Sequence, residues 1–356
     1  MKAAPPPSPQ HTLRSAKALI EAGLAPATER TALEHVEARY AVAVPPVLAA
    51  LIEPGNPDDP IARQVVPQAE ELSTAPHEVE DPIGDQAHEV MAGLIRRYPD
   101  RVLFKPVLVC PLYCRFCFRR AHVGPGQAPM LPPHQVEAAL DWVAAHPEIR
   151  EVILSGGDPF MLSPRRLSAI FKRLDAMAHV EVVRIHTRML TAAPEKLDQA
   201  LLEVLGASAK PLWVVAHINH AKELTSQAVQ AVRALMRVGV PVLAQSVLLR
   251  GVNDSVEGLG GLLRALLRAR IKPYYLHHLD AAPGTAHFHV PVEEGRALLE
   301  ALRGTISGTA MPTYTLDIPG GYGKVPLDAD HLQAIPHGNF PGMVKAPDGS
   351  TRSFQR

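Results

Sequence analysis

The three cysteines of this chain lie close together, as Cys110, Cys114 and Cys117. They form a C-x3-C-x2-C pattern, and thiolates gathered in this way are ligands for an iron–sulfur cluster or for zinc. A four-iron cubane held by three cysteines keeps one iron open for a small molecule, much as a catalytic metal keeps one position for its substrate. A zinc ion completed by a histidine such as His122 is the alternative. Because an odd number of clustered cysteines does not suit a disulfide framework, the pattern predicts a metal site.

Two glycine-rich turns hold the next candidates. The segment 155–158 (SGGD) forms one of them, and Lys324 follows the other, a PGGYG segment at 319–323. Glycine lets the backbone adopt conformations that are closed to other residues. A turn of this kind therefore allows the lysine beside it to project into a pocket.

The elements that must position these residues alternate between strand and helix from about residue 101 onward. Strand-like runs rich in β-branched residues occupy 102–109, 151–154, 180–185, 211–216, 240–249, 273–279 and 313–317. Helical patterns lie between them, at 133–145, 164–177, 194–205, 226–238, 255–268 and 292–303. Strands separated by helices of this length indicate βαβ units and a parallel sheet. The alternation predicts an α/β fold of six β/α units, arranged as a barrel or a partial barrel of the TIM type.

Polar side chains gather where the predicted strands end. Cys110 follows the first strand and the SGGD turn follows the second. The later strands end in further polar groups, among them His186, His217, Gln245, Asp280 and Asp317. In a β/α barrel the carboxyl ends of the strands form the face that carries the active site. We therefore expect these residues to meet at one rim of the barrel.

Two segments flank the predicted barrel. Residues 1–95 read as a helical N-terminal extension, with helical spacing at 12–22, at 29–51 and at 86–97, where the barrel begins. The barrel is expected over 96–327, and 328–356 is expected to form a short C-terminal segment or tail.

The composition excludes several classes of protein. Lysine plus arginine and aspartate plus glutamate each number 36, so the formal net charge is zero. A balanced charge argues against nucleic acid or an anionic membrane as the main partner. The first ten residues lack the apolar core of a signal peptide, and no run of about 18 apolar residues occurs, as a membrane helix would need. We expect a cytoplasmic protein, in a compartment where disulfides are rare.

The cysteine pattern, with Phe116 just before its last cysteine and the SGGD turn after the second strand, resembles the radical S-adenosylmethionine (SAM) superfamily. The resemblance implies a partial barrel of the radical SAM type and a [4Fe-4S] cluster on Cys110, Cys114 and Cys117. The open iron of that cluster would bind SAM through its amino and carboxylate groups. The residues that the resemblance implies near SAM are Ser155, Gly156, Gly157, Asp158, His217 and Gln245.

Further segments resemble the lysine 2,3-aminomutase family of that superfamily, over about residues 97–327. They are RYPDR, CRFCFRR, LSGGDP, HINH, QSVLLRGVND, PYYLHHLD and DIPGGYGK. Family members join radical SAM chemistry to pyridoxal 5′-phosphate (PLP). The resemblance implies that Lys324 forms the Schiff base with PLP and that Arg97, Tyr98 and Arg101 serve the cofactor, whose phosphate suits arginine.

The resemblance also implies which residues bind the substrate, and they number three. By the same resemblance, Arg119 holds the carboxylate of a free amino acid, and Asp280 and Asp317 hold the distal ammonium of lysine. An ammonium in a dry pocket needs such partners, because an unpaired buried charge is costly. The implied reaction is an isomerisation of L-lysine to β-lysine. In it a 5′-deoxyadenosyl radical takes a hydrogen from the β carbon, and the amino group migrates from the α to the β carbon.

Several alternatives stay open on these residues. The enzyme could act on another amino acid, or it could supply β-lysine for the modification of elongation factor P. The chain could also be an iron–sulfur protein used for sensing or electron transfer. The family resemblance implies an electron donor such as flavodoxin or ferredoxin, and a homo-oligomer is expected. Some family members bind a structural zinc through C-terminal cysteines, but no cysteine follows Cys117 here, so we expect no metal beyond the cluster.

Overall fold

The computed structural model describes residues 9–123, 128–328, 342–345 and 351–354. Its body is a ten-stranded sheet whose strands, β1 to β10, follow one another in sequence order. From β3 to β9 each strand runs parallel to the next. These strands are β3 (Arg101–Val107), β4 (Glu151–Gly156), β5 (Val182–Thr187), β6 (Leu212–His217), β7 (Val242–Val247), β8 (Lys272–His277) and β9 (Thr313–Ile318).

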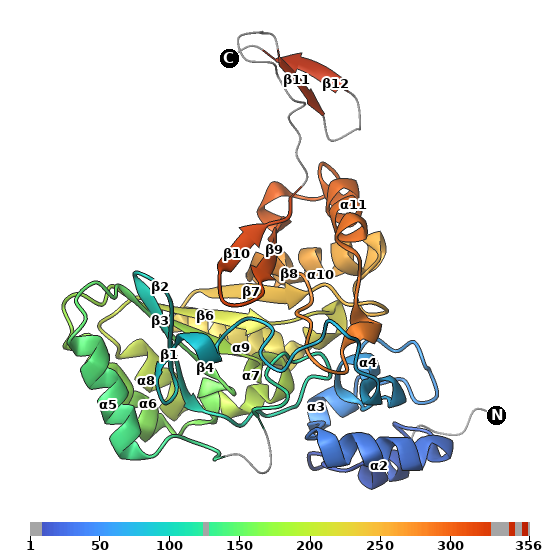
Figure 1. Ribbon diagram of the computed structural model, residues 1–356, viewed down its shortest axis with the longest axis horizontal. Helices are drawn as coiled ribbons and strands as arrows, with labels where there is room; N and C mark the ends of the chain where they lie inside the picture. The colour runs from blue at the N-terminus through green and yellow to red at the C-terminus, as the bar shows by residue number, and fades with distance from the viewer. Residues whose placement is uncertain (1–8, 124–127, 329–341, 346–350, 355–356) are drawn as a thin grey trace.

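Helices cover the outer face of this sheet, with one or more after each of the strands β3 to β8 (Figure 1). They are α5 (Pro133–Ala144), α6 (Pro164–Asp175), α7 (Met189–Ala192), α8 (Gln199–Gly206), α9 (Ser226–Arg237), α10 (Val256–Arg268) and α11 (Val292–Leu302). In α6, Leu167, Ile170, Phe171 and Leu174 recur at helical spacing and are buried in the main core. The Ser163 hydroxyl caps its first turn. The predicted α/β fold with a partial barrel is confirmed.

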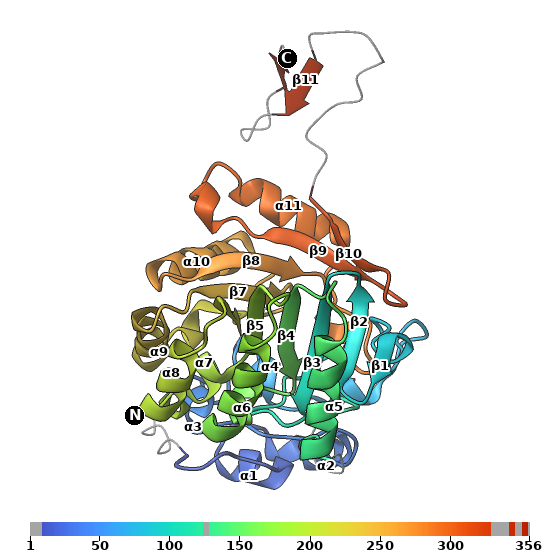
Figure 2. The ribbon, with the colours of Figure 1, turned by 90° about the vertical axis from the view of Figure 1, so that its left-hand side faces the viewer.

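The sheet curves so that its two ends approach each other (Figure 2). The strands beyond the parallel set are antiparallel to their neighbours: β1 (Glu89–Met91), β2 (Leu94–Tyr98) and β10 (Gly323–Pro326). The backbone N–H of Lys324 donates to the Tyr98 hydroxyl over 3.0 Å, and Arg97 pairs with Asp317 at 3.2 Å. Contacts that involve side chains therefore join β2 to the β9–β10 hairpin. Because these strands are not paired as neighbours in the sheet, the barrel is an open arc.

The helix expected over 86–97 is wrong. A single 3-10 turn at Gln86–His88 is followed there by the β1–β2 hairpin. Gly93 has a φ of +77°, which ends any helix, and its N–H donates to the Glu89 side chain over 2.7 Å. The apolar spacing looked helical, but β2 buries its apolar residues by pairing with β3. Tertiary pairing overrides the local pattern in this segment.

The N-terminal residues form short helices, as expected for the extension. They are α1 (Ala16–Glu21), α2 (Arg30–Arg39), α3 (Pro46–Ala49) and α4 (Ala62–Val65). Leu19, Val44 and Leu48 form a small core together with Leu112, which lies between the first two cysteines. The N-terminal residues therefore pack directly on residues 110–120, which carry the three cysteines and are called the cysteine loop.

The expected C-terminal segment, 328–356, falls largely outside the described residues. Its described strands, β11 (Gly342–Lys345) and β12 (Thr351–Phe354), pair antiparallel with each other. In the described part of the chain, every helix is too short or too polar to cross a membrane.

Candidate active site

The cysteine loop follows β3 and carries the three predicted cluster ligands. Cys110, Cys114 and Cys117 line one cavity of about 40 Å³. Burial raises the pKa of all three thiols, that of Cys114 to about 11, and negative charge on neighbouring cysteines raises the values of Cys110 and Cys114 further. A metal centre removes this penalty because it takes up the thiolate charge. The three side chains therefore fit a metal–sulfur centre.

The histidine of the zinc alternative has a different neighbour. His122 Nε2 lies 3.4 Å from Gln86 Nε2. Among the residues that the structure describes, no three or more His, Cys, Asp or Glu side chains are arranged to hold a single metal ion. The three cysteines are therefore not gathered as the ligands of one zinc ion would be.

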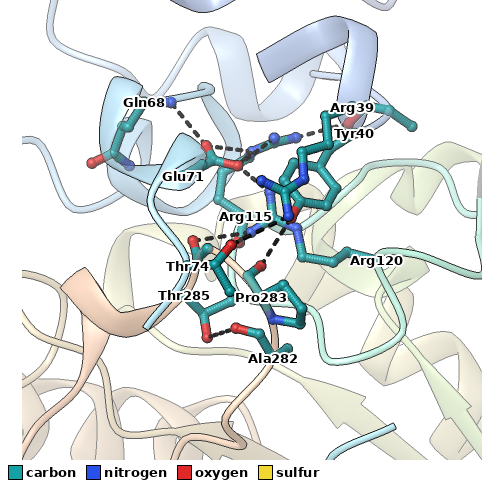
Figure 3. A network of polar contacts seen from close by, with 12 residues as sticks. Arg39, Tyr40, Gln68, Glu71, Thr74, Arg115, Arg120, Ala282, Pro283 and Thr285 are labelled. Atoms are coloured by element: carbon teal, nitrogen blue, oxygen red, sulfur yellow. Dashed lines mark hydrogen bonds and ion pairs between the residues drawn. The ribbon is translucent and has the colours of Figure 1, made fainter. Parts of the chain in front are cut away.

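Two arginines of the cysteine loop, Arg115 and Arg120, bind one buried carboxylate, that of Glu71 (Figure 3). Arg115 Nε lies 3.0 Å from Glu71 Oε1 and Arg115 Nη2 lies 2.6 Å from Oε2. Arg115 Nη1 also donates to the Ala41 carbonyl over 2.7 Å. Burial alone would raise the pKa of Glu71, but the two guanidinium groups hold it below its usual value. This anchor, which the sequence analysis missed, ties the cysteine loop to the N-terminal residues.

Replacing Glu71 with alanine is expected to lower the free energy of unfolding by about 3–5 kcal/mol, because two buried guanidinium groups lose their shared partner. Urea denaturation of the iron-free protein measures the change. Glu181→Ala is the control, since it removes a carboxylate that pairs with Arg150 on the surface, and it should cost less than about 1 kcal/mol. A loss no larger than that of the control would contradict the anchoring role.

The predicted glycine turn pairs with the residues just before the first cysteine. The backbone N–H of Gly157 donates to the Val107 carbonyl over 2.7 Å, and that of Asp158 donates to the Val109 carbonyl over 2.9 Å. A Cβ on Gly157 would lie 2.3 Å from the Val109 oxygen. Glycine is required there for the close approach of the two backbones. The turn therefore fixes the direction in which the chain enters Cys110.

The Asp158 carboxylate joins the ends of β4 and β5. It is buried, and it accepts hydrogen bonds from the Thr187 hydroxyl at 2.8 Å and from the N–H groups of Arg188 at 2.7 Å and Phe160 at 3.0 Å. Burial raises its pKa in spite of these donors. Ser155 is buried in the same turn. The predicted SAM residue Asp158 therefore also connects the carboxyl ends of β4 and β5.

Three histidines lie near the carboxyl ends of parallel strands of the sheet: His186 on β5, His217 on β6 and His277 on β8. His217 is opposite Gln245 on β7, whose Nε2 is 3.5 Å from His186 Nδ1. Within the described chain, Nε2 of His186 and Nε2 of His217 are buried without a hydrogen-bond partner. Burial lowers the pKa of both rings far below the usual value and that of His277 to about 3. The rings are therefore neutral, and the unused nitrogens can bind a ligand.

His217 and Gln245 were predicted near SAM, whereas His186 and His277 were not assigned to the site. His186 had been placed among the strand-end residues of the rim but was given no role. His277 lies inside the predicted strand 273–279, and only the observed end of β8 places it near the rim.

Lys324 lies opposite Asp317 across the β9–β10 hairpin, and its amine forms an ion pair with the Asp317 carboxylate. Arg97 Nη1 contacts the other oxygen of that carboxylate at 3.2 Å. The Tyr98 hydroxyl accepts the backbone N–H of Lys324, and the Arg101 guanidinium stacks on the Tyr98 ring, 3.8 Å from its centroid. The structure brings together the four residues predicted for PLP, and Asp317 lies among them.

The glycine turn before Lys324 has an unusual backbone conformation. Gly320, Gly321 and Gly323 have φ values of +85°, +85° and +97°, a region in which other residues are strained. A Cβ on Gly323 would lie 3.1 Å from the Tyr98 hydroxyl. The turn thus brings Lys324 close to Tyr98.

Asp280 follows β8, and its carboxylate makes no hydrogen bond or ion pair to any other described residue. Burial raises its pKa to about 7, and the charge of Asp317 adds to the rise, while Lys324, Arg97 and Arg119 oppose it. A half-buried carboxylate in a desolvated site is costly without a partner unless it is protonated or meets a cation. Asp280 is therefore a ready site for a positively charged group.

Arg119 faces the same space. Its charge acts on the titration of Asp280, His186 and Cys110. Its guanidinium pairs with Asp85 at 2.8 Å, a residue that the sequence analysis did not single out. The charge of the predicted carboxylate-binding arginine thus acts both on the first cysteine and on the predicted ammonium-binding Asp280.

An arc of parallel β/α units with three converging cysteines and a glycine turn at its rim defines a radical SAM enzyme. Residues 105–260 match the model of the Radical SAM superfamily. The cofactors of that class are a [4Fe-4S] cluster and SAM, as the cysteine pattern implied.

Curated relatives define the family more closely. The chain is 37% identical to L-lysine 2,3-aminomutase of Clostridium subterminale, over 85% of this chain and 74% of that protein. It is 40% identical to L-lysine 2,3-aminomutase of Escherichia coli (strain K12), over 81% of this chain and 84% of that protein. The chain therefore belongs to the lysine 2,3-aminomutase family, and it is a radical SAM aminomutase, an isomerase. The resemblance noted in the sequence is confirmed.

Proposed function

We propose that this enzyme converts L-lysine to β-lysine by way of a 5′-deoxyadenosyl radical, with PLP as a further cofactor. The observation that carries the proposal is the pair of opposite charges facing one space. Arg119 suits the carboxylate of an amino acid, and the unpaired Asp280 suits a distal ammonium. Free lysine carries both groups. The names of the two relatives support the same substrate.

The residues present fit the three cofactors. The cysteines suit the cluster, the unused nitrogens of His186 and His217 suit polar atoms of SAM, and Lys324 beside Arg97 suits PLP. When bound, the cluster and SAM supply a radical that abstracts hydrogen, and PLP supplies a conjugated ring that delocalises an unpaired electron. The protein positions the substrate and excludes water.

Asp317 has two successive roles in this assignment. Its carboxylate is shared by Arg97 and Lys324, which departs from the simple expectation that both aspartates stand ready for the substrate. When Lys324 turns to the cofactor, Asp317 Oδ2 is released while Oδ1 stays with Arg97. Asp280 and the released oxygen then hold the substrate ammonium together.

The experiment that tests this function is anaerobic incubation of the reconstituted enzyme with SAM, PLP, a reductant and one amino acid at a time. Product mass and chromatographic retention identify the isomer. β-Lysine formed from lysine alone is the expected outcome. Turnover of a different amino acid with lysine left unchanged would overturn the substrate, and no isomerised product from any amino acid would overturn the function.

The affinity for lysine is expected to fall about tenfold from pH 8 to pH 6, because Asp280, with a pKa of about 7, becomes protonated over this interval and loses the charge that binds ammonium. The charged groups around it are Asp317, Lys324, Arg97 and Arg119. Calorimetric titration of the reconstituted enzyme at several pH values measures the change.

Asp280→Asn should bind lysine weakly and with little pH dependence over this range. Asp141→Asn is the control, since it alters an exposed carboxylate paired with Arg173, and it should keep the wild-type profile. A pH dependence that survives in Asp280→Asn would show that another group controls binding.

The remaining assignments complete the proposal. We assign residues 1–95 to an extension that supports the cysteine loop, 96–327 to the catalytic arc and 328–356 to a tail. The one-electron reductant is a small donor such as flavodoxin or ferredoxin, and the enzyme works in the cytoplasm as a homo-oligomer. The charge balance of the chain supports a small-molecule substrate rather than nucleic acid or a membrane surface.

A further inference from the structure

Asp85 lies at the centre of a short segment, 81–88, that touches several parts of the site. The Asp81 carboxylate accepts the N–H groups of Asp85 and Gln86, each at 2.8 Å, and so fixes the turn. The Ile83 carbonyl accepts a hydrogen bond from Arg97 at 3.0 Å. Gly84, with a φ of +69°, lies so close to the turn before Lys324 that a Cβ would be 2.4 Å from the Gly320 carbonyl carbon. The backbone of Asp85 is therefore held from both sides.

The Asp85 carboxylate uses one oxygen for one edge of the Arg119 guanidinium. Asp85 Oδ2 lies 3.0 Å from Arg119 Nε and 2.8 Å from Nη2. These two nitrogens form the side edge of the planar group. Among the residues that the structure describes, none hydrogen-bonds to the end edge, which is made by Nη1 and the second proton of Nη2. Asp85 is 6% exposed, and the charge of Arg119 holds its pKa below the usual value although burial alone would raise it. The ion pair therefore holds the Arg119 side chain in one direction. The end edge of its guanidinium can still form two parallel hydrogen bonds to another carboxylate.

The free edge of Arg119 has the geometry for a substrate carboxylate. A guanidinium binds a carboxylate through two parallel hydrogen bonds when the planes of the two groups align. A long arginine side chain loses rotamer freedom when it is held in one direction, and Asp85 imposes that restriction before the substrate arrives. The charge of Arg119 also reaches Asp280, which is proposed to bind the other end of the substrate.

We propose that Asp85 is a positioning residue that presents the end edge of Arg119 to the carboxylate of the amino acid substrate. The proposal rests on the lysine function proposed above. Asp85 does not touch the reacting atoms. It acts through Arg119, so its removal weakens recognition of the substrate carboxylate and leaves recognition of the distal ammonium intact.

The test compares L-lysine with 1,5-diaminopentane, which lacks only the carboxylate, by anaerobic calorimetry on the reconstituted holoenzyme. The wild type is expected to bind lysine at least about tenfold more tightly than the diamine, because charge-assisted bidentate hydrogen bonds are strong. Asp85→Asn keeps the shape of the side chain, and it should raise the Kd of lysine about tenfold and that of the diamine less than about twofold. Iron content and SAM affinity should not change. Asp85→Glu, which restores the charge, should recover part of the preference.

Glu181→Gln, an exposed carboxylate variant, is the matched control and should bind both ligands as the wild type does. Four results would overturn the proposal. One is an unchanged ratio of the two Kd values in Asp85→Asn, and another is an equal loss of both ligands, which marks a purely structural role. A third is tighter lysine binding, which would make Asp85 a competitor for Arg119. The fourth is a wild type that does not bind lysine more tightly than the diamine. That result would contradict the proposed lysine function itself, and it would be seen before any variant is tested.

Discussion

Lys324→Ala should lower the rate of β-lysine formation about a thousandfold or more, equivalent to roughly 4 kcal/mol of barrier. The reason is that its side-chain amine, which pairs with Asp317, is the nucleophile proposed for PLP, while its backbone N–H donates to the Tyr98 hydroxyl. Covalent attachment of PLP should also be lost. Borohydride reduction of the PLP-treated, iron-free protein, followed by peptide mass analysis, measures the attachment directly.

Two controls accompany this variant. Iron content after reconstitution should equal that of the wild type, because Lys324 lies on β10 and its amine pairs with Asp317, which is not one of the cluster ligands. Lys17→Ala removes an exposed lysine that pairs with Glu21 on α1, and it should keep both attachment and activity. Retention of the PLP-labelled peptide in Lys324→Ala would refute the assignment.

Cys114→Ala should lose the cluster and, with it, all measurable activity. A four-iron cubane with only two of its three protein thiolates has two irons without a protein ligand, and thiolate ligation is what holds such clusters. Iron and sulfide analysis after anaerobic reconstitution, together with the paramagnetic resonance signal of the reduced cluster, measures the loss. We expect iron to fall to a small fraction of the wild-type content.

His122→Ala separates the cluster from the zinc alternative. The His122 ring lies near Gln86, so its removal should leave the iron content unchanged. A reconstituted wild type that holds zinc instead of iron, and that loses this zinc in His122→Ala, would reverse the assignment of the metal site.

The body of the fold was predictable because its signals are local. Strands β3 to β9 and the helices that lie between them each carry their own period of apolar residues, as the buried face of α6 illustrates. The rule that parallel strands end at one rim then predicted that Cys110, Asp280 and Asp317 lie on the same face. The β1–β2 hairpin was missed because its spacing is ambiguous and its pairing with β3 decides the outcome.

The supporting residues of the site could not be read from the sequence. Glu71 lies 44 residues from Arg115, and Asp85 lies 34 residues from Arg119. A carboxylate in an irregular segment has no periodic pattern and resembles any exposed acid. Only the folded chain brings these acids to the arginines around the cysteines. The family resemblance implied roles for residues such as Arg119, but it did not indicate which other residues contact them in the folded chain.

The contact between the two ends of the arc has a consequence for the order of biosynthesis. Glu71 and Arg120 are 49 residues apart, whereas Tyr98 and Lys324 are 226 residues apart. A ribosome that adds about 5–20 residues per second makes the lysine roughly 10–45 s after the tyrosine. A nascent chain therefore displays its three thiols well before the amine that completes the opposite side of the site has been made. The thiols proposed to hold the cluster are thus synthesised before the lysine proposed to bind PLP in every newly made copy.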